Sequence, residues 1–551
     1  GAEQEALRTM KQSLDRAPPD ERTRILEFLA EAAKARSLRW TAKGAPWSDT
    51  AVNEILSLAF IDPDRFFGDD THFQELILAH LPHTIDPEVP RGLQLRLLQT
   101  LAKVSQMRAN TLEAIALKGG FAVRESGDRE LLTNPADWEI DDDGLSPISS
   151  LLFSMPASMF AREDCQGLLD SVQHHSPNTD LLVLTDATGL GGPRTRIATP
   201  WMTGLTPWLR DPFLVARDSG NRLTLLSRTL HQSGREADRL TGRQIVSAAP
   251  EAWDQALGPV HWSDVSFPFH GGQLLFTPGT VWVSVHSLEW RLLQILETER
   301  IDPSQLSSPE GWADFVRAVN QAADELSTLC HREVRFVHPW PTPPPDMSHR
   351  DYVDSLAGGN DLDLDTLIAI LAHPDGLTLV VGDIAQGSTI AASTSNPSWN
   401  AFAKKTGIDL GANALRNGLI AAQTSKRVIG IQRFIDLVES HFSNQGLSTR
   451  RTPLLMVPTA FITRNPRLSA NQPHDWFPLG YSNVVIESIP NSEQPLRAQV
   501  FSTGLPEFDQ TAKKTYEEIG CSLILHPPLM ESLICEGGFR CATQQVRRRS
   551  N

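Results

Sequence analysis

The chain has 551 residues, of which 40% are hydrophobic and 21% charged, a composition that supports a sizeable buried core and excludes a mainly disordered protein. At about 100–200 residues per domain, this length also excludes a single small module. The formal net charge of −16 is the opposite of the basic surface that binds a phosphate backbone, so we expect no nucleic-acid partner.

The N-terminal part of the sequence predicts helices. Apolar residues such as Leu93, Leu97 and Leu101 recur at helical spacing until Gly119 and Gly120 end the pattern. We therefore predict a helical domain over residues 1–125. An acidic linker over 126–150 is expected to follow, because its aspartates are contiguous and lack the alternate spacing of a calcium loop.

From residue 151 to 551 the pattern changes to short apolar runs separated by turn residues and helices. The clearest unit predicts strands at 484–487 and 498–502, a helix at 509–519 and a strand at 521–525. A looser unit of the same order covers 273–337, with helices at 287–300 and 309–329. Strands that alternate with helices in this way indicate an α/β architecture of repeated units.

Membrane and disulfide signals are both missing from the sequence. No run of 18 or more apolar residues is present, and the N-terminus has no basic stretch followed by an apolar one, so we expect a soluble protein with no membrane partner. It would be cytoplasmic if its N-terminus is complete, but the opening Gly-Ala leaves a removed signal open. The cysteines are too scattered for a disulfide framework, and no C-x-x-C pair indicates a metal site. They are Cys165, Cys330, Cys521, Cys535 and Cys541.

A cysteine motif lies near the end of the chain. Residues 536–548 (EGGFRCATQQVRR) place Cys541 after a glycine pair, where backbone can approach a ligand closely. A nucleophilic cysteine needs such an open position. Taken alone, the same cysteine also fits a small buried residue.

Carboxylates form two further candidate elements. Asp211 follows Trp208 and Arg210 in TPWLRDPFLV, and a carboxylate with such apolar neighbours either pairs with a cation of the fold or receives a cationic ligand. Asp361, Asp363 and Asp365 alternate in GNDLDLDT, so an extended segment would point all three to one face. The alternative for this second group is a solvent-facing strand edge. Between these elements, Gly271 and Gly272 follow His270, where a glycine pair is typical of a bulge or turn.

In this order the elements resemble the guanidine-modifying enzymes of the pentein fold, particularly agmatine deiminases and protein-arginine deiminases. That family has a W-x-R-D element, a Gly-Gly element, an H-x-D element, an asparagine-bearing strand and a glycine-rich cysteine motif. The corresponding positions here are 208–211, 271–272, 363–365, Asn483 and 537–545. The cysteine motif is similar to that of agmatine deiminases, and residues 546–548 resemble the end of protein-arginine deiminases.

The resemblance covers about residues 150–551 and implies a five-bladed ββαβ propeller, the pentein fold, preceded by the helical domain. It implies a cysteine-dependent deiminase acting on peptidyl-arginine or a small arginine-derived compound. Asp211 and Asp365 would clamp the guanidinium, with Gly271, Gly272 and Asn483 also binding substrate. Cys541 would attack the guanidinium carbon, and water would hydrolyse the thiouronium to a ureido product.

No cofactor and no metal are expected, and calcium dependence is not carried over, because the N-terminal region looks helical here. The habit of the family would make the protein a homodimer.

One departure from the family concerns its general acid/base histidine. Asp363 occupies that position, while His270 stands where agmatine deiminases often have an acidic residue. Three substitutes remain open: Asp363 itself beside Asp361 and Asp365, a nearby histidine (His270 or His373), or the literal H-x-D at His349 and Asp351. Two other functions also remain open, a catalytically degenerate module that binds guanidinium groups or a protein, and an amidinotransferase.

Overall fold

The computed structural model describes residues 138–547 with gaps, which are 142–145, 158, 199–205, 219–221, 229–237, 239–240, 249–256, 258–259, 266, 302–307, 346, 358–361, 374, 463–475, 490–494 and 535–536. The chain divides into one compact unit of residues 1–129, 200–205 and 231–249 and a second of 130–199, 206–230 and 250–551. The predicted helical domain lies outside the described residues and stays a prediction. Of the first unit, the structure describes helix α9 (Thr241–Ala248) and Asp238.

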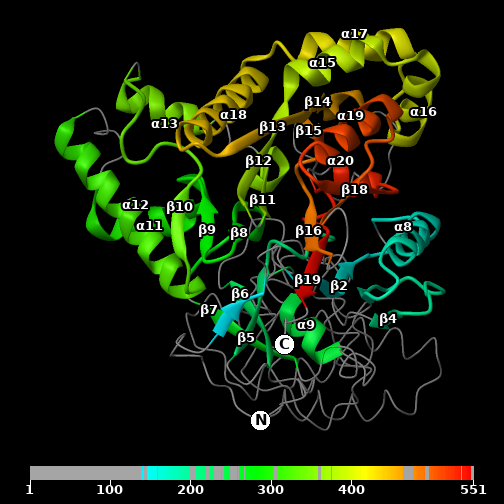
Figure 1. Cartoon of the computed structure of the whole chain (residues 1–551), viewed down its shortest axis with the longest axis horizontal. Helices are drawn as coiled ribbons and strands as arrows, with labels where there is room; N and C mark the ends of the chain where they lie inside the picture. Colours follow the sequence, from blue (N-terminus) through cyan, green and yellow to red (C-terminus); the bar gives the residue numbers. More distant parts are fainter. Residues whose placement is uncertain are drawn as a thin grey trace, which may run out of the picture. The chain divides into compact units, whose positions relative to one another are not determined.

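The second unit is mixed α/β, which confirms the predicted class (Figure 1). Five of its sheets share one pattern, an antiparallel pair followed by a third strand parallel to the second. Four of them are β5 (Phe213–Asp218), β6 (Leu223–Arg228) and β7 (Val260–Val265); β8 (Leu275–Thr277), β9 (Thr280–Val283) and β10 (Glu333–Phe336); β11 (Ile368–His373), β12 (Gly376–Asp383) and β13 (Ser448–Pro453); and β16 (Val485–Ser488), β17 (Leu496–Phe501) and β18 (Cys521–His526).

The fifth sheet joins the two ends of this unit. Its first strand, β19 (Thr543–Arg547), comes from the end of the described chain and pairs antiparallel with β2 (Ile148–Ser154), which runs parallel to β3 (Asp180–Leu184). The last strand of the described residues is therefore held by one of the first described strands. This pairing places Cys541 directly before a strand that is buried along its whole length.

Short strands extend two sheets and form a sixth. β1 (Trp138–Ile140) pairs antiparallel with β5, and β4 (Thr195–Ala198) runs parallel to β3. β14 (Leu455–Pro458) and β15 (Trp476–Leu479) form an antiparallel pair. Strand β1 lies inside the stretch that the sequence assigned to a linker, so structured residues begin before that predicted boundary.

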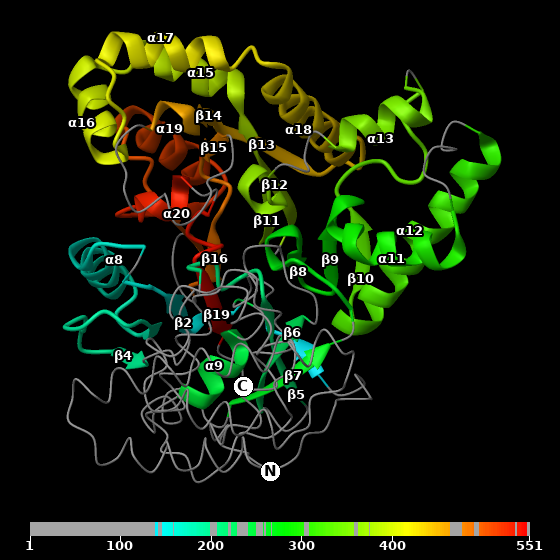
Figure 2. The ribbon, with the colours of Figure 1, turned by 180° about the vertical axis from the view of Figure 1, so that it is seen from behind.

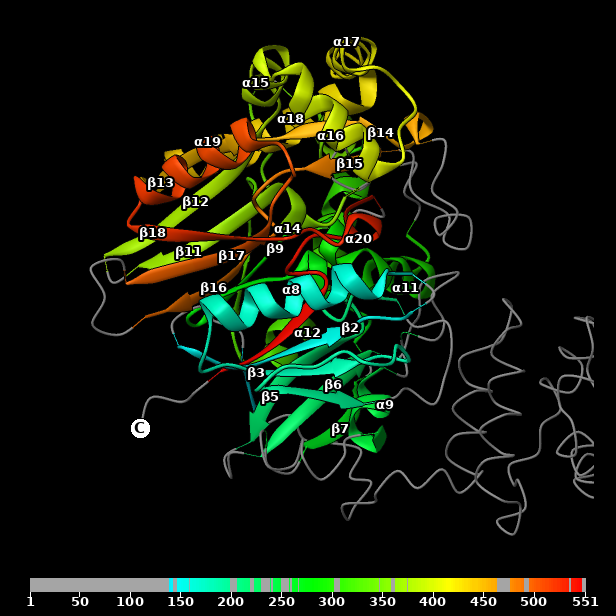
Figure 3. The ribbon, with the colours of Figure 1, turned by 90° about the vertical axis from the view of Figure 1, so that its right-hand side faces the viewer.

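Helices fill the crossovers that parallel pairing requires. α8 (Arg162–His175) connects β2 to β3, and α11 (Glu289–Glu299) and α12 (Pro309–Cys330) lie beside β9 and β10, as Figure 2 shows from behind. α19 (Pro506–Glu517) contacts both β13 and β18 (Figure 3). The β12–β13 crossover holds α15 (Ile384–Ser393), α16 (Asn396–Thr406), α17 (Ala412–Ala422) and α18 (Lys426–Asn444). The shorter α13 (His349–Ala357), α14 (Leu364–Leu367) and α20 (Met530–Ile534) lie in loops between sheets.

Local sequence explains where these helices begin. The Ser308 hydroxyl accepts a hydrogen bond from the Gly311 amide at the start of α12, where proline occupies the first helical position. The predicted C-terminal ββαβ unit is confirmed as β16, β17, α19 and β18. In the part of the chain that the structure describes, every helix is too short or too polar to cross a membrane.

Strand β11 separates two hydrophobic cores. Because successive side chains of a strand point to opposite faces, Ala369 and Leu371 pack into one core while Ile368 and Ile370 pack into the other. The first core surrounds α8, β2, β3 and β16–β18, and the second surrounds β8, β9, α11, α12 and α18. The sheets are thus fixed on both faces, and so are the loops that precede them.

A buried histidine in β18 gives the fold an acid-sensitive point. His526 Nε2 lies 2.9 Å from Gln499 Oε1, Nδ1 lies 3.0 Å from Ser171 Oγ, and the ring stacks on Phe539. Burial lowers the pKa of His526 to about 3, and nearby His175 and Arg497 add to this effect. The neutral ring therefore contributes stability above about pH 6.5, which is lost as the pH falls towards 3.

We expect His526→Gln to flatten the acid side of the stability profile. Between pH 7 and pH 5, the neutral His526 ring accounts for a loss of about 2 kcal/mol in the free energy of unfolding, since its pKa is lowered on folding. Urea unfolding at both pH values would measure this loss in the parent chain, in His526→Gln and in the exposed-site control His174→Gln. An unchanged pH dependence in His526→Gln would show that this ring is not the group responsible.

Candidate active site

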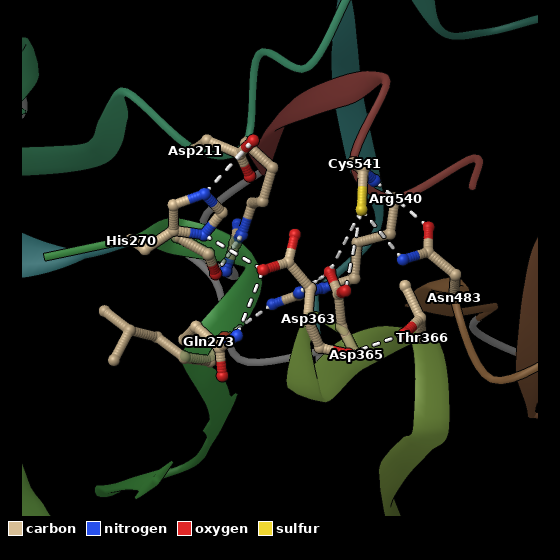
Figure 4. A network of polar contacts seen from close by, with 12 residues as sticks. Asp211, His270, Gln273, Asp363, Asp365, Thr366, Asn483, Arg540 and Cys541 are labelled. Carbon is tan, nitrogen blue, oxygen red and sulfur yellow. Dashed lines mark hydrogen bonds and ion pairs between the residues drawn. The ribbon is translucent and has the colours of Figure 1, made fainter. Parts of the chain in front are cut away.

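Each candidate residue lies in the loop that precedes the first strand of one of the five similar sheets. Asp211 comes before β5, the 3₁₀ turn of 271–273 before β8, the helical turn α14 before β11, Asn483 before β16 and Cys541 before β19. Five equivalent loops therefore supply one element each. Hydrogen bonds and ion pairs connect these loops to one another (Figure 4).

The Cys541 thiol lies at the centre of this cluster. The residue is only 1% exposed, and its Sγ lies 3.5 Å from Asp365 Oδ1 and 3.7 Å from Oδ2. Asn483 holds it from the other side, because its Nδ2 donates to Sγ at 2.9 Å and its Oδ1 accepts from the Cys541 amide at 3.1 Å. The amide side chain thus fixes both the backbone and the sulfur of Cys541.

The surroundings of the Cys541 thiol oppose its ionisation. Burial raises the pKa of Cys541 well above its usual value, and the carboxylates of Asp365, Asp363 and Asp211 raise it further. The hydrogen bond from Asn483 lowers it by a smaller amount. A cation placed among these carboxylates would offset their charge and lower the pKa of Cys541 again.

Asp365 is completely buried and bound to an internal cation. Its Oδ2 accepts from Arg540 Nη1, while Arg540 Nη2 donates to the Leu274 carbonyl at 2.7 Å. Burial raises the pKa of Asp365, and the Arg540 guanidinium opposes that rise. Two buried charges of opposite sign, with their remaining donors bonded, are the arrangement in which a buried ion pair is tolerated.

His270 lies between two other carboxylates. Its Nε2 is 3.5 Å from Asp211 Oδ2, and its Nδ1 is 3.2 Å from Asp363 Oδ1. Asp363 also accepts from Gln273 Nε2 at 3.1 Å. Asp211 thus lies beside His270, and the neighbouring Arg210 donates to the Gly271 carbonyl and to Gln544.

Asp363 connects the two halves of the site. One atom each of Asp211, His270 and Asp363 lie within 4.8 Å of one another, and so do one atom each of Asp363, Asp365 and Cys541. A row of three carboxylates that ends beside a thiol suits a bound organic cation. The expected absence of a metal and of a cofactor is not tested by the structure and stays a prediction.

The glycines of the motifs allow close packing between the loops. A Cβ on Gly271 would lie 1.8 Å from the Arg210 carbonyl oxygen, and one on Gly272 would lie 2.6 Å from Asp363 Oδ2. A Cβ on Gly537 would meet the Trp208 ring, and one on Gly538 would meet Asn483. Gly271 and Gly272 were predicted to bind substrate. The structure shows that both positions also need glycine because a Cβ would not fit there.

One detail of the sequence-based prediction is wrong. Asp363 and Asp365 do not lie on an extended strand, since Asp363 begins the helical turn α14 and Asp365 lies within it. The Thr366 amide and hydroxyl bond back to the Asp363 carbonyl and stabilise this turn. Both side chains still lie near the thiol, because the tertiary fold places this turn beside Cys541. The turn therefore brings the two carboxylates to one side, as the extended segment was expected to do.

The alternative histidines lie elsewhere in the fold. His349 stacks on Trp312 at a centroid distance of 4.3 Å, within the packing of α12 and α13. His373 ends β11, at the opposite end of that strand from α14. Of the histidines considered from the sequence, the structure brings His270 to the site. Asp361 lies outside the described residues.

Sequence reasoning missed Arg540 and Gln273. Arg540 directly precedes the cysteine in GGFRC, and an arginine in an otherwise apolar and glycine-rich motif is the signal that could have found it. Its bond to Asp365 crosses 175 positions of sequence, so no local pattern predicts its partner.

Comparisons with known proteins give a likeness in structure. No protein-family profile and no curated protein match the chain. An agmatine deiminase from C. jejuni is similar at 13% identity, over 75% of this chain and 98% of the other, with a TM-score of 0.43. An agmatine deiminase from Enterococcus faecalis is similar at 11% identity, over 75% of this chain and 97% of the other, with a TM-score of 0.43. DDAH from Pseudomonas aeruginosa is similar at 9% identity, over 72% of this chain and 99% of the other, with a TM-score of 0.27. At these values the likeness does not decide what this chain binds or converts.

Proposed function

We propose that this chain is a cysteine-dependent hydrolase of a guanidino group. The observation that carries the proposal is the pair of carboxylates, Asp363 and Asp365, beside one buried thiol, with Asp365 Oδ1 at 3.5 Å from Cys541 Sγ and with Asp211 next to Asp363. A guanidinium is planar, cationic and rich in N–H donors, so it matches such carboxylates better than other common substrate groups do.

The geometry at Asp365 supports attack by the thiol. Its Oδ2 is used by Arg540, whereas its Oδ1 faces Cys541 Sγ. A guanidinium N–H that donates to Oδ1 would therefore lie beside the sulfur. Asp211, on the other side of the cluster, would fix the opposite edge of the guanidinium and hold its carbon still.

The cation would also activate the thiol. With a positive charge among Asp211, Asp363 and Asp365, the carboxylates that oppose ionisation of Cys541 are compensated. The thiolate would then attack the guanidinium carbon, ammonia would leave, and water would convert the thiouronium to a ureido product. Peptidyl-arginine or a small arginine-derived compound is the proposed substrate class.

The same proposal includes a pentein-type propeller of five ββαβ blades. It is supported by the five sheets with one strand order and by the candidate residues, which lie in the loops before the first strands of these sheets. In this arrangement β19, β2 and β3 complete the fifth blade with strands from both ends of the unit.

A substrate panel tests the proposal. The full chain would be incubated with L-arginine, agmatine, a methylated arginine and an arginine-containing peptide, and the ureido product would be measured together with the released ammonia, or with the methylamine released from the methylated arginine. We expect one of them to yield equal amounts of both, and Asp211→Asn to reduce the rate by about 10²-fold, because the guanidinium loses a positioning contact. Product that appears only with an added acceptor amine, and without water uptake, would identify an amidinotransferase.

A catalytically silent guanidinium-binding module is the second candidate. It is favoured by one observation, that Asp211 and Asp365 each already contact a cationic or protonatable side chain, His270 and Arg540. Calorimetric binding of a panel compound without any ammonia or ureido product would support this candidate and contradict the hydrolase.

A further inference from the structure

His270 and Asp363 are the members of the cluster that reach solvent. Their side chains are 14% and 23% exposed, whereas Asp211 is 2% exposed and Asp365 0%. The two are in direct contact at 3.2 Å. The buried half of the site, with Cys541 and Asp365, is thus connected to solvent through this pair.

Asp363 lies between His270 and the thiol. Figure 4 shows its carboxylate with His270 on one side and with Asp365 and Cys541 on the other. Gln273 Nε2 donates a hydrogen bond to Asp363 Oδ1. Asp363 Oδ2 packs against Gly272 so closely that a Cβ there would lie 2.6 Å from it. The Asp363 side chain is therefore held in one orientation, with an oxygen within 4.8 Å of Sγ.

We infer that His270 and Asp363 form a proton relay, in which Asp363 exchanges protons with the reacting atoms and His270 exchanges them with solvent. The inference rests on the proposed hydrolase function. A histidine next to the thiol was expected from the resemblance, with an acidic residue near the glycine pair. In this chain the carboxylate, Asp363, lies near the thiol, and the histidine, His270, lies near the glycine pair. The two side chains are in contact, so the histidine–carboxylate pair is present with its positions exchanged.

The relay balances both halves of the reaction. In the first, the Cys541 thiol proton passes to Asp363, the sulfur forms its bond to the guanidinium carbon, and the proton passes on to the leaving nitrogen as the C–N bond breaks and ammonia departs. In the second, water adds to the thiouronium carbon and the C–S bond breaks. One water proton returns to sulfur, and the other leaves through Asp363 and His270.

Other charged groups facing the pair bear on its protonation. They come from three loops and are Asp211, Asp365, Arg210, Arg540 and Cys541. The relay assigns Asp363 a catalytic role, because it exchanges protons with the reacting atoms from within 4.8 Å of Cys541 Sγ. His270 is a positioning residue, because it acts through Asp363.

The test is the pH profile of Cys541 alkylation by 2-chloroacetamidine, a cationic reagent that needs the thiolate but no turnover. We expect His270→Gln to shift this profile and to slow it at least 10-fold near neutrality, and Asp363→Asn to slow it about 10²-fold or more. The exchanged variant His270→Asp with Asp363→His should recover most of the rate. His373→Gln, a histidine outside the site, serves as the control.

The same variants separate the relay from the hydrolase. A shifted alkylation profile in a chain that turns over none of the panel compounds would support proton transfer from the thiol and contradict the hydrolase. A profile in His270→Gln identical to that of the parent chain, with no recovery in the exchanged variant, would overturn the relay even if the parent chain hydrolyses a guanidino compound. With turnover, His270→Gln should lower kcat more than it changes KM.

Discussion

Replacing Cys541 with alanine is expected to lower turnover of the guanidino substrate by about 10⁴-fold or more, because no other group of the site can form the covalent intermediate. The fold should survive, since the cysteine is small and its loop is held by the Asn483 and Arg210 contacts to its backbone. The measurement is ureido product formed per enzyme, with urea unfolding of the same preparation as the check on folding.

Cys330→Ala is the matched control for this experiment. Cys330 is as buried as Cys541, and burial raises its pKa to about 12, but it lies in α12 with no carboxylate cluster around it. Turnover should be unchanged. In the parent chain, 2-chloroacetamidine should label Cys541 selectively, while a neutral haloacetamide should show no such preference. Turnover that survives in Cys541→Ala would disprove thiol attack.

The comparison of Cys330 with Cys541 shows that the pKa of a cysteine without substrate does not by itself determine its reactivity. Cys330 and Cys541 both have a raised pKa, so burial alone does not distinguish them. What sets Cys541 apart is that part of its raised pKa comes from carboxylates, and a bound cation can cancel that part. The thiol is therefore expected to be unreactive without substrate and activated by it.

The strand order of the C-terminal ββαβ unit could be predicted from the sequence, and so could several residues of the candidate site, although not Arg540 or Gln273. Buried strands such as 484–487 and 521–525 stand out as apolar runs between turn residues, and the helix between them has helical periodicity. Asp211, Asp365 and Cys541 stand in local motifs, whereas Asn483 was assigned only through the family resemblance. These signals are short-range, and each needs only its own segment of chain.

The contacts between those segments could not be predicted. The bond from Arg540 to Asp365, and the position of His270 between Asp211 and Asp363, depend on how separate loops meet. An arginine side chain has several rotatable bonds, and its direction is set by tertiary packing that a single sequence does not reveal. The same reason explains why the sequence left three substitutes open for the missing histidine.

Replacing Arg540 with methionine is expected to destabilise the fold by about 3–5 kcal/mol at neutral pH, because it leaves the fully buried Asp365 without its partner. The loss should shrink as the pH falls, since protonation removes the unpaired charge. Urea unfolding of the parent chain and of Arg540→Met at pH 7 and pH 4 would measure both effects. Arg194→Met removes an exposed ion pair with Asp180 and should cost less than about 1 kcal/mol.

A double-mutant cycle decides what the ion pair does. If Arg540 mainly compensates the buried charge, Arg540→Met combined with Asp365→Asn should cost less than the sum of the two single changes, because the double variant has no charge left to bury. Additive losses would mean instead that Arg540 stabilises the fold through its bond to the Leu274 carbonyl. The first outcome also bears on catalysis. Both Asp365 oxygens lie near Cys541 Sγ, at 3.5 and 3.7 Å, and Oδ2 also accepts from Arg540, so the residue that permits the buried carboxylate also holds it beside the thiol.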